Sequence, residues 1–225
     1  MPQAASRTSL LSTLLRAALL VGLAAGVCQV AHAAEPAPMW KSLFDGKSLA
    51  GWKKSGFGGD GDVEVKDARI ILSAGSPLTG LTCTTEVPKK NYEISLDAMR
   101  VNGSDFFCGL TFPVGESPCS FIVGGWGGGV VGLSSIDGSD ASENETTQYQ
   151  EFESGRWYAI RVRVTNDKIQ AWIDKTKMAD VELKDKKISI RIEVEVSRPL
   201  GIASFATTAA LRNIRIRTLS PAELH

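Results

Sequence analysis

The segment from Gly124 to Gly129 holds the aromatic residue whose setting is best suited to ligand binding. Five glycines surround Trp126 in Gly124-Gly-Trp-Gly-Gly-Gly129, so the indole has few local side chains to pack against. An aromatic face held in this way can stack on the apolar face of a sugar ring. The segment therefore predicts a carbohydrate site with Trp126 as its platform.

A polar loop follows Trp126 closely along the chain and is rich in oxygen-bearing side chains. Asp137 and Glu143 are its candidate general acid and base, and Asp140 and Asn144 are candidate substrate-binding residues. Such a loop could also bind Ca²⁺, which takes about six to eight oxygen ligands. The competing interpretation is that Trp126 caps the edge of the fold while the acids only solvate a turn.

Two further pairs of acids have the spacing that glycoside cleavage can use. Glu193 and Glu195, like Asp62 and Glu64, are two residues apart and would lie about 6.6–6.8 Å apart on one side of a strand. Glycosidases hold two carboxyl groups about 5–5.5 Å or about 6.5–9.5 Å apart. Because any half-buried strand shows the same alternation, a solvated strand face is the favoured interpretation.

Histidine usage excludes several other chemistries. The chain has two histidines, His32 near the N-terminus and the C-terminal His225, so a Ser-His-Asp triad, a Cys-His pair and a histidine zinc site lack their imidazoles. The glycine pattern from Gly127 to Gly132 matches a dinucleotide fingerprint, but no helix is predicted after it. We therefore expect no resident cofactor, apart from the Ca²⁺ alternative.

Residues 1–33 have the composition of a signal peptide. Arg16 precedes an apolar run from Ala17 to Val27, which is about half of the roughly 20 residues that a spanning helix needs. The run leads to Ala31-His32-Ala33, a site that signal peptidase can cut. We expect cleavage near Ala33 and export to the periplasm or beyond. Lipid attachment at Cys28 is the alternative, although Val27 is bulky for a lipobox.

Charge and hydropathy of the mature chain exclude two classes of partner. The leader contains two arginines and no acid, which leaves 23 basic and 25 acidic residues from totals of 25 and 25, a net charge of −2. No basic field is therefore present to attract nucleic acid or anionic lipid. No other segment is apolar enough to span a membrane, and oligomeric state is not predicted.

Alternation with a period of two, broken by Gly, Asn and Asp turns, predicts short strands through residues 40–220. Trp157–Thr165 and Lys168–Asp174 form the most regular predicted hairpin, and Ile188–Val196 is another predicted strand. About eleven strands require two facing sheets to bury their apolar sides. We therefore predict an all-β, two-sheet antiparallel sandwich at 40–220, after a linker at 34–39 and before a tail at 221–225.

Three cysteines remain after the leader, and the strand pattern suggests how two of them pair. If the chain turns between Pro113 and Val114, Cys108 lies opposite Cys119, close to disulfide geometry. An oxidising destination would permit this bond. The prediction is a Cys108–Cys119 disulfide with Cys83 as a free thiol.

Three stretches together resemble one family. Ser42–Trp52, the run from Gly155 to Asp174, and Ala210–Leu219 are similar in order and spacing to the opening, central hairpin and closing strand of the 3-keto-disaccharide hydrolase domain. The resemblance implies a concanavalin A-like jelly roll, exported, that cleaves glycosides first oxidised at C3. Ser120–Trp126 lacks the carboxylate that the family usually has there, so no site residue is carried over.

Three functions follow as hypotheses. The first is a carbohydrate-active hydrolase of this type, with carboxylates of the 137–145 loop as acid and base. The second is a non-catalytic, lectin-like module that binds glycan through Trp126. The third is a structural domain of the cell envelope. An enzyme needs two carboxyl groups facing each other beside Trp126, whereas a lectin needs only the aromatic and scattered polar groups.

Overall fold

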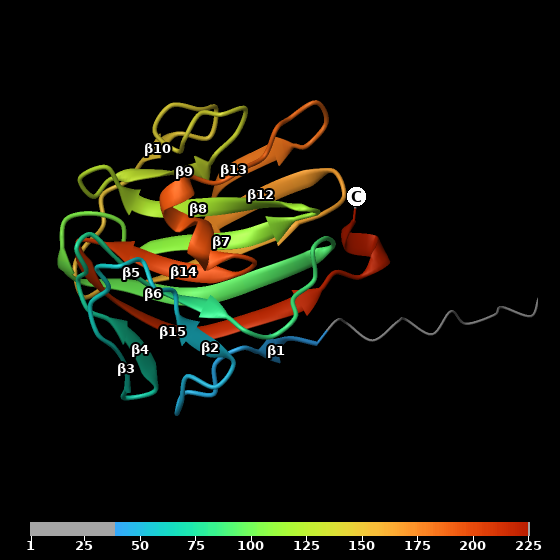
Figure 1. Cartoon of the computed structure of the whole chain (residues 1–225). Helices are drawn as coiled ribbons and strands as arrows, with labels where there is room; N and C mark the ends of the chain where they lie inside the picture. The colour runs from blue at the N-terminus through green and yellow to red at the C-terminus, as the bar shows by residue number, and fades with distance from the viewer. Residues whose placement is uncertain (1–38, 225) are drawn as a thin grey trace, which may run out of the picture. The chain divides into compact units, whose positions relative to one another are not determined.

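Two antiparallel β-sheets lie face to face in the computed structural model, which describes residues 39–224 (Figure 1). The eight-stranded sheet has the order β13-β12-β11-β6-β15-β4-β3, and β1 also pairs with β15. Its strands are β1 (Lys41–Ser42), β3 (Val63–Lys66), β4 (Arg69–Leu72), β6 (Tyr92–Gly103), β11 (Trp157–Val164), β12 (Lys168–Ile173), β13 (Thr176–Glu182) and β15 (Thr207–Thr218).

The seven-stranded sheet has the order β10-β9-β8-β7-β14-β5-β2. Its strands are β2 (Trp52–Lys54), β5 (Leu78–Cys83), β7 (Cys108–Val114), β8 (Ser117–Gly125), β9 (Val130–Ser134), β10 (Gln148–Tyr149) and β14 (Gly201–Phe205). Two short 3₁₀ helices, η1 (Ile192–Ser197) and η2 (Pro221–Glu223), complete the described structure. The predicted all-β, two-sheet antiparallel sandwich is confirmed.

Side-chain alternation explains how the sheets form one core. In β11, Tyr158, Ile160, Val162 and Val164 are fully buried, while the residues between them lie on the outer face. The predicted hairpin is present, with Val164 opposite Ile169 across the turn. Burial of each of these aliphatic side chains contributes about 1.5–3 kcal/mol of hydrophobic free energy to folding.

The hairpin of β7 and β8 corrects the predicted disulfide. Pro113 and Val114 continue β7, and the turn falls at Gly115, whose φ of +62° suits glycine. Phe112 therefore lies opposite Cys119, and Cys108 lies opposite Val123. The two cysteines are offset by four residues, or about 13 Å along a strand. Both are free and buried, as is Cys83, so the predicted Cys108–Cys119 bond is wrong.

The segment before β14 is not the predicted strand. Residues 192–197 form η1, so the strand spacing expected for Glu193 and Glu195 does not apply. η1 lies against β5, where the Thr82 hydroxyl donates to the Val196 carbonyl at 2.8 Å. A Cβ at Gly201 would come within 2.6 Å of the Ser197 carbonyl oxygen. The segment therefore covers the outer face of the seven-stranded sheet instead of extending it.

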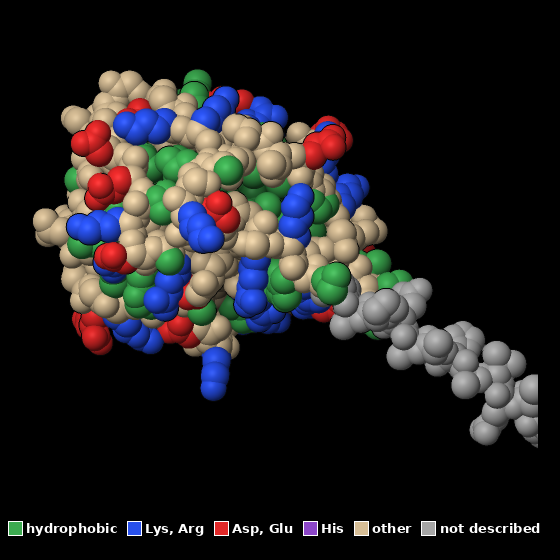
Figure 2. Space-filling model, turned by 90° about the horizontal axis from the view of Figure 1, so that it is seen from below, with side chains coloured by type: hydrophobic (Ala, Val, Ile, Leu, Met, Phe, Trp, Pro, Cys, Tyr) green, Lys and Arg blue, Asp and Glu red, His purple; other side chains and the backbone are tan. Residues whose placement is uncertain are grey.

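The predicted signal peptide at 1–33, the lipobox cysteine Cys28 and most of the predicted linker lie outside the described residues. Within 39–224, no helix is long and apolar enough to cross a membrane. At the other end, η2 occupies most of the predicted tail, and its Glu223 carboxylate accepts from Arg217 at 2.7 Å. Figure 2 shows one side of the surface, where basic and acidic side chains are interspersed with hydrophobic ones.

Candidate functional site

Small and hydroxyl-bearing side chains form the outer face of the seven-stranded sheet. The strand register aligns one row of residues, most of them with hydroxyl groups, across five strands. The members of this row are Thr82, Gly201, Thr111, Ser120 and Ser134. The adjacent row is mainly glycine and alanine, and its members are Gly80, Ala203, Gly109, Ile122 and Gly132. These two rows make a flat floor on which other segments can lie closely.

Covering segments do lie within contact distance of this floor. A Cβ at Gly109 would be 2.9 Å from the Phe106 ring, and one at Gly132 would be 2.9 Å from the Ala141 carbonyl oxygen. Larger side chains at these positions would push the covering segments away. Because the segments cover the floor only in part, a hollow remains above Ser120 and Ile122.

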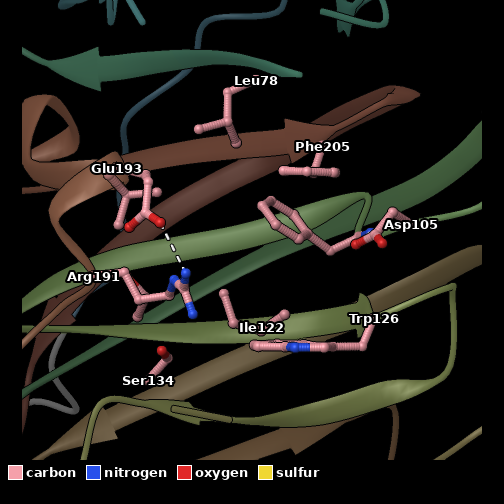
Figure 3. Close-up of a pocket in the computed structure, with 11 residues that line it drawn as sticks. Leu78, Asp105, Ile122, Trp126, Ser134, Arg191, Glu193 and Phe205 are labelled. Atoms are coloured by element: carbon pink, nitrogen blue, oxygen red, sulfur yellow. Dashed lines mark hydrogen bonds and ion pairs between the residues drawn. The ribbon is translucent and has the colours of Figure 1, made fainter. Parts of the chain in front are cut away.

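This hollow is a pocket with a volume of about 230 Å³ (Figure 3). Trp126 lies on one side of it, and Phe205 lies opposite (Figure 3), in contact with the Phe106 ring. Arg191 and Glu193 come from the segment at η1 and reach into the pocket beside Ser134 (Figure 3). The lining residues are Leu78, Asp105, Phe106, Ser120, Ile122, Trp126, Ser134, Arg191, Glu193, Val194 and Phe205.

Trp126 follows the end of β8 and has unusual backbone geometry. Its φ of +48° lies in the left-handed region, which residues other than glycine seldom occupy. The side chain is 44% exposed and lies beside Ile122 in the pocket wall (Figure 3). A large exposed aromatic on a conformationally restricted turn is a typical ligand-binding feature. The predicted platform residue therefore lines a pocket.

The buried guanidinium of Arg100 holds the turn that carries Trp126. It donates to the carbonyl oxygens of Gly128 at 2.9 Å, Asp105 at 3.3 Å and Gly124 at 3.4 Å, and burial lowers its pKa. A Cβ at Gly124 would lie 2.7 Å from the Arg100 Nη2 atom. The glycine-rich sequence around Trp126 therefore makes room for this arginine.

Asp105 ties the same turn from the pocket side. Its Oδ2 atom accepts from the Gly127 N–H at 2.9 Å, and its Oδ1 atom accepts from the Phe106 N–H at 2.7 Å. The carboxylate thus connects the residue after Trp126 to the phenylalanine on the opposite wall. Together, Arg100 and Asp105 set the distance between the two walls of the pocket.

Three charged side chains form a linked group at the polar end of the pocket. Arg191 donates to Asp140 at 2.7 Å and to Glu193 at 2.8 Å. The hydrogen bond from Arg191 lowers the pKa of Glu193. Burial raises the pKa of Asp140, but hydrogen bonds from Ser142 and Arg191 outweigh that effect and the net shift is downward. Both carboxyl groups are therefore ionised at neutral pH.

The other predicted loop residues have different positions. Asp137 accepts from the Lys187 N–H at 2.8 Å, which lowers its pKa, and it lies 3.3 Å from the Lys186 ammonium. Asn144 donates to three main-chain carbonyl oxygens and accepts from Thr146, so it organises the loop internally. Glu143 is exposed. None of Asp137, Glu143 and Asn144 lines the pocket, whereas Asp140 holds its arginine.

Sequence reasoning missed Arg191, Asp105 and the phenylalanine wall. Alternation in 120–123 could have assigned Ser120 and Ile122 to the outer face, because the intervening Phe121 belongs to the core. No sequence pattern indicates that the segment at Arg191 folds over this face. Glu193 was identified as one of a strand pair, but its partner in the structure is Arg191.

The carboxylates of the polar loop do not converge on one point. Asp137 and Glu145 both contact Lys186, whereas Asp140 contacts Arg191. Within residues 39–224, no group of three or more His, Cys, Asp or Glu residues is arranged to hold a metal ion. The fold therefore does not bring together the Ca²⁺ ligands that the loop composition suggested.

The described residues form an antiparallel two-sheet β-sandwich with an aromatic-walled pocket on one outer face. The chain belongs to the family of 3-keto-alpha-glucoside-1,2-lyase-like domains, whose model matches residues 39–217. This match confirms the resemblance identified from the sequence. No curated protein sequence matches the chain.

Three solved structures share the fold at low sequence identity. Crh5 transglycosylase has a TM-score of 0.56 and 11% identity, over 83% of this chain and 86% of that chain. Domain 4 of AbnA, an extracellular arabinanase from Geobacillus stearothermophilus solved with arabinotriose, has a TM-score of 0.53 and 13% identity, over 84% and 98%. The carbohydrate-binding module CBM66 from Bacillus subtilis has a TM-score of 0.52 and 12% identity, over 75% and 96%.

Proposed function

We propose that this domain binds a glucoside oxidised at C3 in the Trp126 pocket and cleaves its C1–O bond. The observation that carries the proposal is the position of Trp126 in the same pocket as the Arg191–Glu193 ion pair. The family name supports the substrate class, because a 1,2-lyase acting on a 3-keto-glucoside breaks the bond at C1 and removes a proton at C2.

Sugar binding would use the aromatic wall and the polar end together. The apolar face of the ring would stack on Trp126, which is already exposed and held by its turn. Arg191 supplies N–H donors for ring oxygens, and its pKa is raised by the hydrogen bond to Glu193, so it stays charged. In the orientation that we propose, C2 and C3 of the sugar face the ion pair.

The chemistry then follows from the carbonyl at C3. That carbonyl makes the hydrogen on C2 acidic, and the Glu193 carboxylate would accept this proton as the general base. The electron pair of the C2–H bond forms the C1=C2 double bond while the C1–O bond breaks, and the leaving oxygen takes up a proton from solvent water. The products are an unsaturated ketone and a free alcohol. Later addition of water across C1=C2 would give the outcome of a hydrolase.

Arg191 would stabilise the charge that develops during this step. Removal of the C2 proton places negative charge on the C3 oxygen, and a fixed cation in a partly enclosed pocket favours that charge. Asp140 holds the guanidinium from the side opposite to Glu193, which keeps it oriented. Because the pKa of Glu193 is lowered, the base form is present at neutral pH and is lost only in acid.

A second candidate is a glycan-binding module without catalysis. Both oxygens of Asp105 accept main-chain N–H groups, and Glu193 is paired with Arg191. Both carboxylates that line the pocket therefore have hydrogen-bond partners. Such engagement suits a site that recognises hydroxyl groups and performs no proton transfer.

The discriminating experiment uses residues 34–225 and a 3-keto-glucoside with a chromophoric leaving group, with and without EDTA. We expect release of the leaving group together with the ultraviolet absorbance of an unsaturated ketone. Glu193→Gln should reduce turnover by about a hundredfold or more while binding persists. Trp126→Ala should weaken binding. Asp137→Asn and Glu143→Gln are matched controls outside the pocket and should retain activity. Binding without turnover by the wild-type protein would establish the module instead.

We also propose that residues 1–33 direct export of the domain. The supporting features are the apolar run before Val27 and the Ala31-His32-Ala33 site. Mass spectrometry of the exported product should find Ala34 at its N-terminus. A chain that begins at a lipid-modified Cys28 would contradict this proposal and identify a lipoprotein.

A further inference from the structure

The pocket has two chemically different ends. Arg191, Glu193 and Ser134 form one end, which offers charged groups and a hydroxyl (Figure 3). The Phe205 ring lies toward the other end, opposite Trp126 (Figure 3), and the Phe106 ring of the pocket lining is in contact with it. A ligand that fills the whole pocket must therefore be polar on one part and apolar on the other.

The apolar end is built by the register of two neighbouring strands. Phe205 of β14 lies directly opposite Leu78 of β5 on the outer face. The Phe106 and Phe205 rings are in contact, with centroids 5.7 Å apart and planes inclined at 42°. Phe106 is fixed from below by the floor at Gly109 and from the side by Asp105. The wall is therefore preorganised for a flat group lying between it and Trp126.

Polar partners are scarce at this end of the pocket. Asp105 is the charged residue of the pocket lining beside Phe106. Both of its carboxylate oxygens already accept main-chain N–H groups, so they are not free to bind a ligand hydroxyl. A second sugar placed here would bring hydroxyl groups against carbon surfaces. Each hydroxyl that loses water without gaining a partner weakens binding roughly tenfold. A disaccharide is therefore a poor match to this wall.

Pocket volume limits the leaving group further. At about 230 Å³, the pocket is smaller than the roughly 300–1,000 Å³ of typical drug-sized ligand sites. Once a sugar ring lies beside Arg191 and Glu193, the remaining space suits a short group such as one aromatic ring. A long polycyclic group would extend beyond the wall of Phe106 and Phe205.

We infer that the glucosides cleaved here carry a small aromatic leaving group, such as a simple phenol, held between Trp126 and the Phe106–Phe205–Leu78 wall. This inference rests on the proposed function and specifies its substrate class. The sugar occupies the end at Arg191 and Glu193, where its apolar face covers the nearer part of the Trp126 indole, and the phenol occupies the apolar end and covers the rest of the indole. On this assignment, Phe205 and Leu78 determine leaving-group specificity, and neither takes part in proton transfer.

The test compares three 3-keto-glucosides that differ only in the leaving group, namely phenyl, methyl and glucosyl. We expect kcat/KM for the phenyl compound to exceed that for the glucosyl compound at least tenfold. Phe205→Ser should lower kcat/KM for the phenyl compound about tenfold and leave the methyl compound within about twofold. Phe205→Leu, which keeps an apolar side chain, should restore most of the loss, and Tyr149→Ser is a control on an exposed aromatic of β10.

Several outcomes separate this inference from the proposed function. If all three compounds are cleaved and the glucosyl compound is cleaved as fast as the phenyl compound, the inference is overturned while the function stands. If none is cleaved, the proposed function fails, and calorimetry with phenyl and glucosyl compounds still tests the preference as binding. Equal affinity of the two compounds for the protein would overturn the inference. If Phe205→Ser does not fold, the Phe205→Leu variant and the three substrates decide the question.

Discussion

On the outer face of the eight-stranded sheet, charged side chains of neighbouring strands pair with one another, whereas the outer face of the seven-stranded sheet is covered by loops. Glu93 of β6 illustrates the first arrangement, with contacts to Arg163 at 2.8 Å, Arg161 at 3.1 Å and Arg217 at 3.2 Å. Each of these arginines comes from a strand beside β6. Cross-strand register alone therefore supplies the partners of Glu93.

Tryptophan side chains on the outer face of the eight-stranded sheet also have arginine partners. The guanidinium groups of Arg161, Arg212 and Arg215 lie over indole rings at 3.8, 4.0 and 4.6 Å from the ring centroids. The rings belong to Trp172, Trp157 and Trp40, respectively. On the other face, the glycine and hydroxyl rows offer almost no side-chain volume. Larger side chains therefore pair with one another on one outer face, whereas small side chains on the other leave space for loops and a pocket.

The largest expected effect concerns the outer face of the eight-stranded sheet, where charged side chains pair (the paired face). Glu93→Gln removes the charge shared by three arginines at a site that is 3% exposed, and should lower the free energy of unfolding by about 3 kcal/mol. Asp97→Asn is the matched control, because its partner Arg212 is 40% exposed, and should cost less than about 1 kcal/mol. Urea unfolding measures both. Equal losses would show that burial does not distinguish the two carboxylates.

A smaller effect is expected at the row of small residues on the outer face of the seven-stranded sheet. Gly132→Ala places a Cβ 2.9 Å from the Ala141 carbonyl oxygen and should cost about 2 kcal/mol, because the polar loop must shift. At Gly129, a Cβ would lie 3.5 Å from the Gln150 carbonyl oxygen, which is ordinary contact, so Gly129→Ala should be close to neutral. Thermal unfolding checks the pair. If Gly132→Ala were also neutral, the loop would not depend on the close approach.

The third prediction concerns the arginine that sets the pocket width. Arg100→Lys keeps the charge but loses the planar guanidinium that reaches carbonyl oxygens of three loop segments. We expect a loss of about 1 kcal/mol in stability and about tenfold weaker binding of a ligand that stacks on Trp126. Isothermal titration calorimetry with the ligand measures the binding. Unchanged affinity would show that the turn keeps its shape without Arg100.

The smallest expected effect is a pH dependence at the end of the paired face. Glu223 has a pKa of about 2, lowered mainly by the hydrogen bond from Arg217, against an ordinary value of 4.5. A lowered folded-state pKa stabilises the fold above pH 4.5, and this contribution is lost as the pH falls from 4.5 toward 2. Glu223→Gln should therefore flatten the acid-unfolding curve over this range. An identical curve for the variant would contradict the linkage.

Alternation along the chain was sufficient to predict the sandwich, because a strand with one buried face shows its period in local sequence. The hairpin of Trp157–Val164 and Lys168–Ile173 was predicted in type and in turn position. The hairpin at Cys108 was predicted in type but not in register. Proline favours a turn, but Pro113 lies within β7 and the left-handed turn residue is Gly115.

The pocket was predictable only in part, because its residues come from distant parts of the sequence. Trp126 was identified from its glycine setting, which is a local feature. Leu78, Arg191 and Phe205 meet it only through sheet order and through the path of η1 over the sheet. The alternating run from Ile192 to Val196 resembles a strand, and only its packing on β5 and β14 reveals a 3₁₀ helix.

The three free cysteines within residues 39–224 have a consequence for how the domain can be studied. Burial raises the pKa of Cys108 and Cys119 to about 12, so almost no thiolate is present at neutral pH, and the thiolate is the reactive form. Both sulfur atoms lie inside the core between the sheets. A thiol-specific reagent should therefore modify them only when the two sheets separate. The rate of modification would then measure the rate at which the sheets separate. Since no covalent cross-link joins these two strands, the domain should reach the same folded state in a reducing or an oxidising solution.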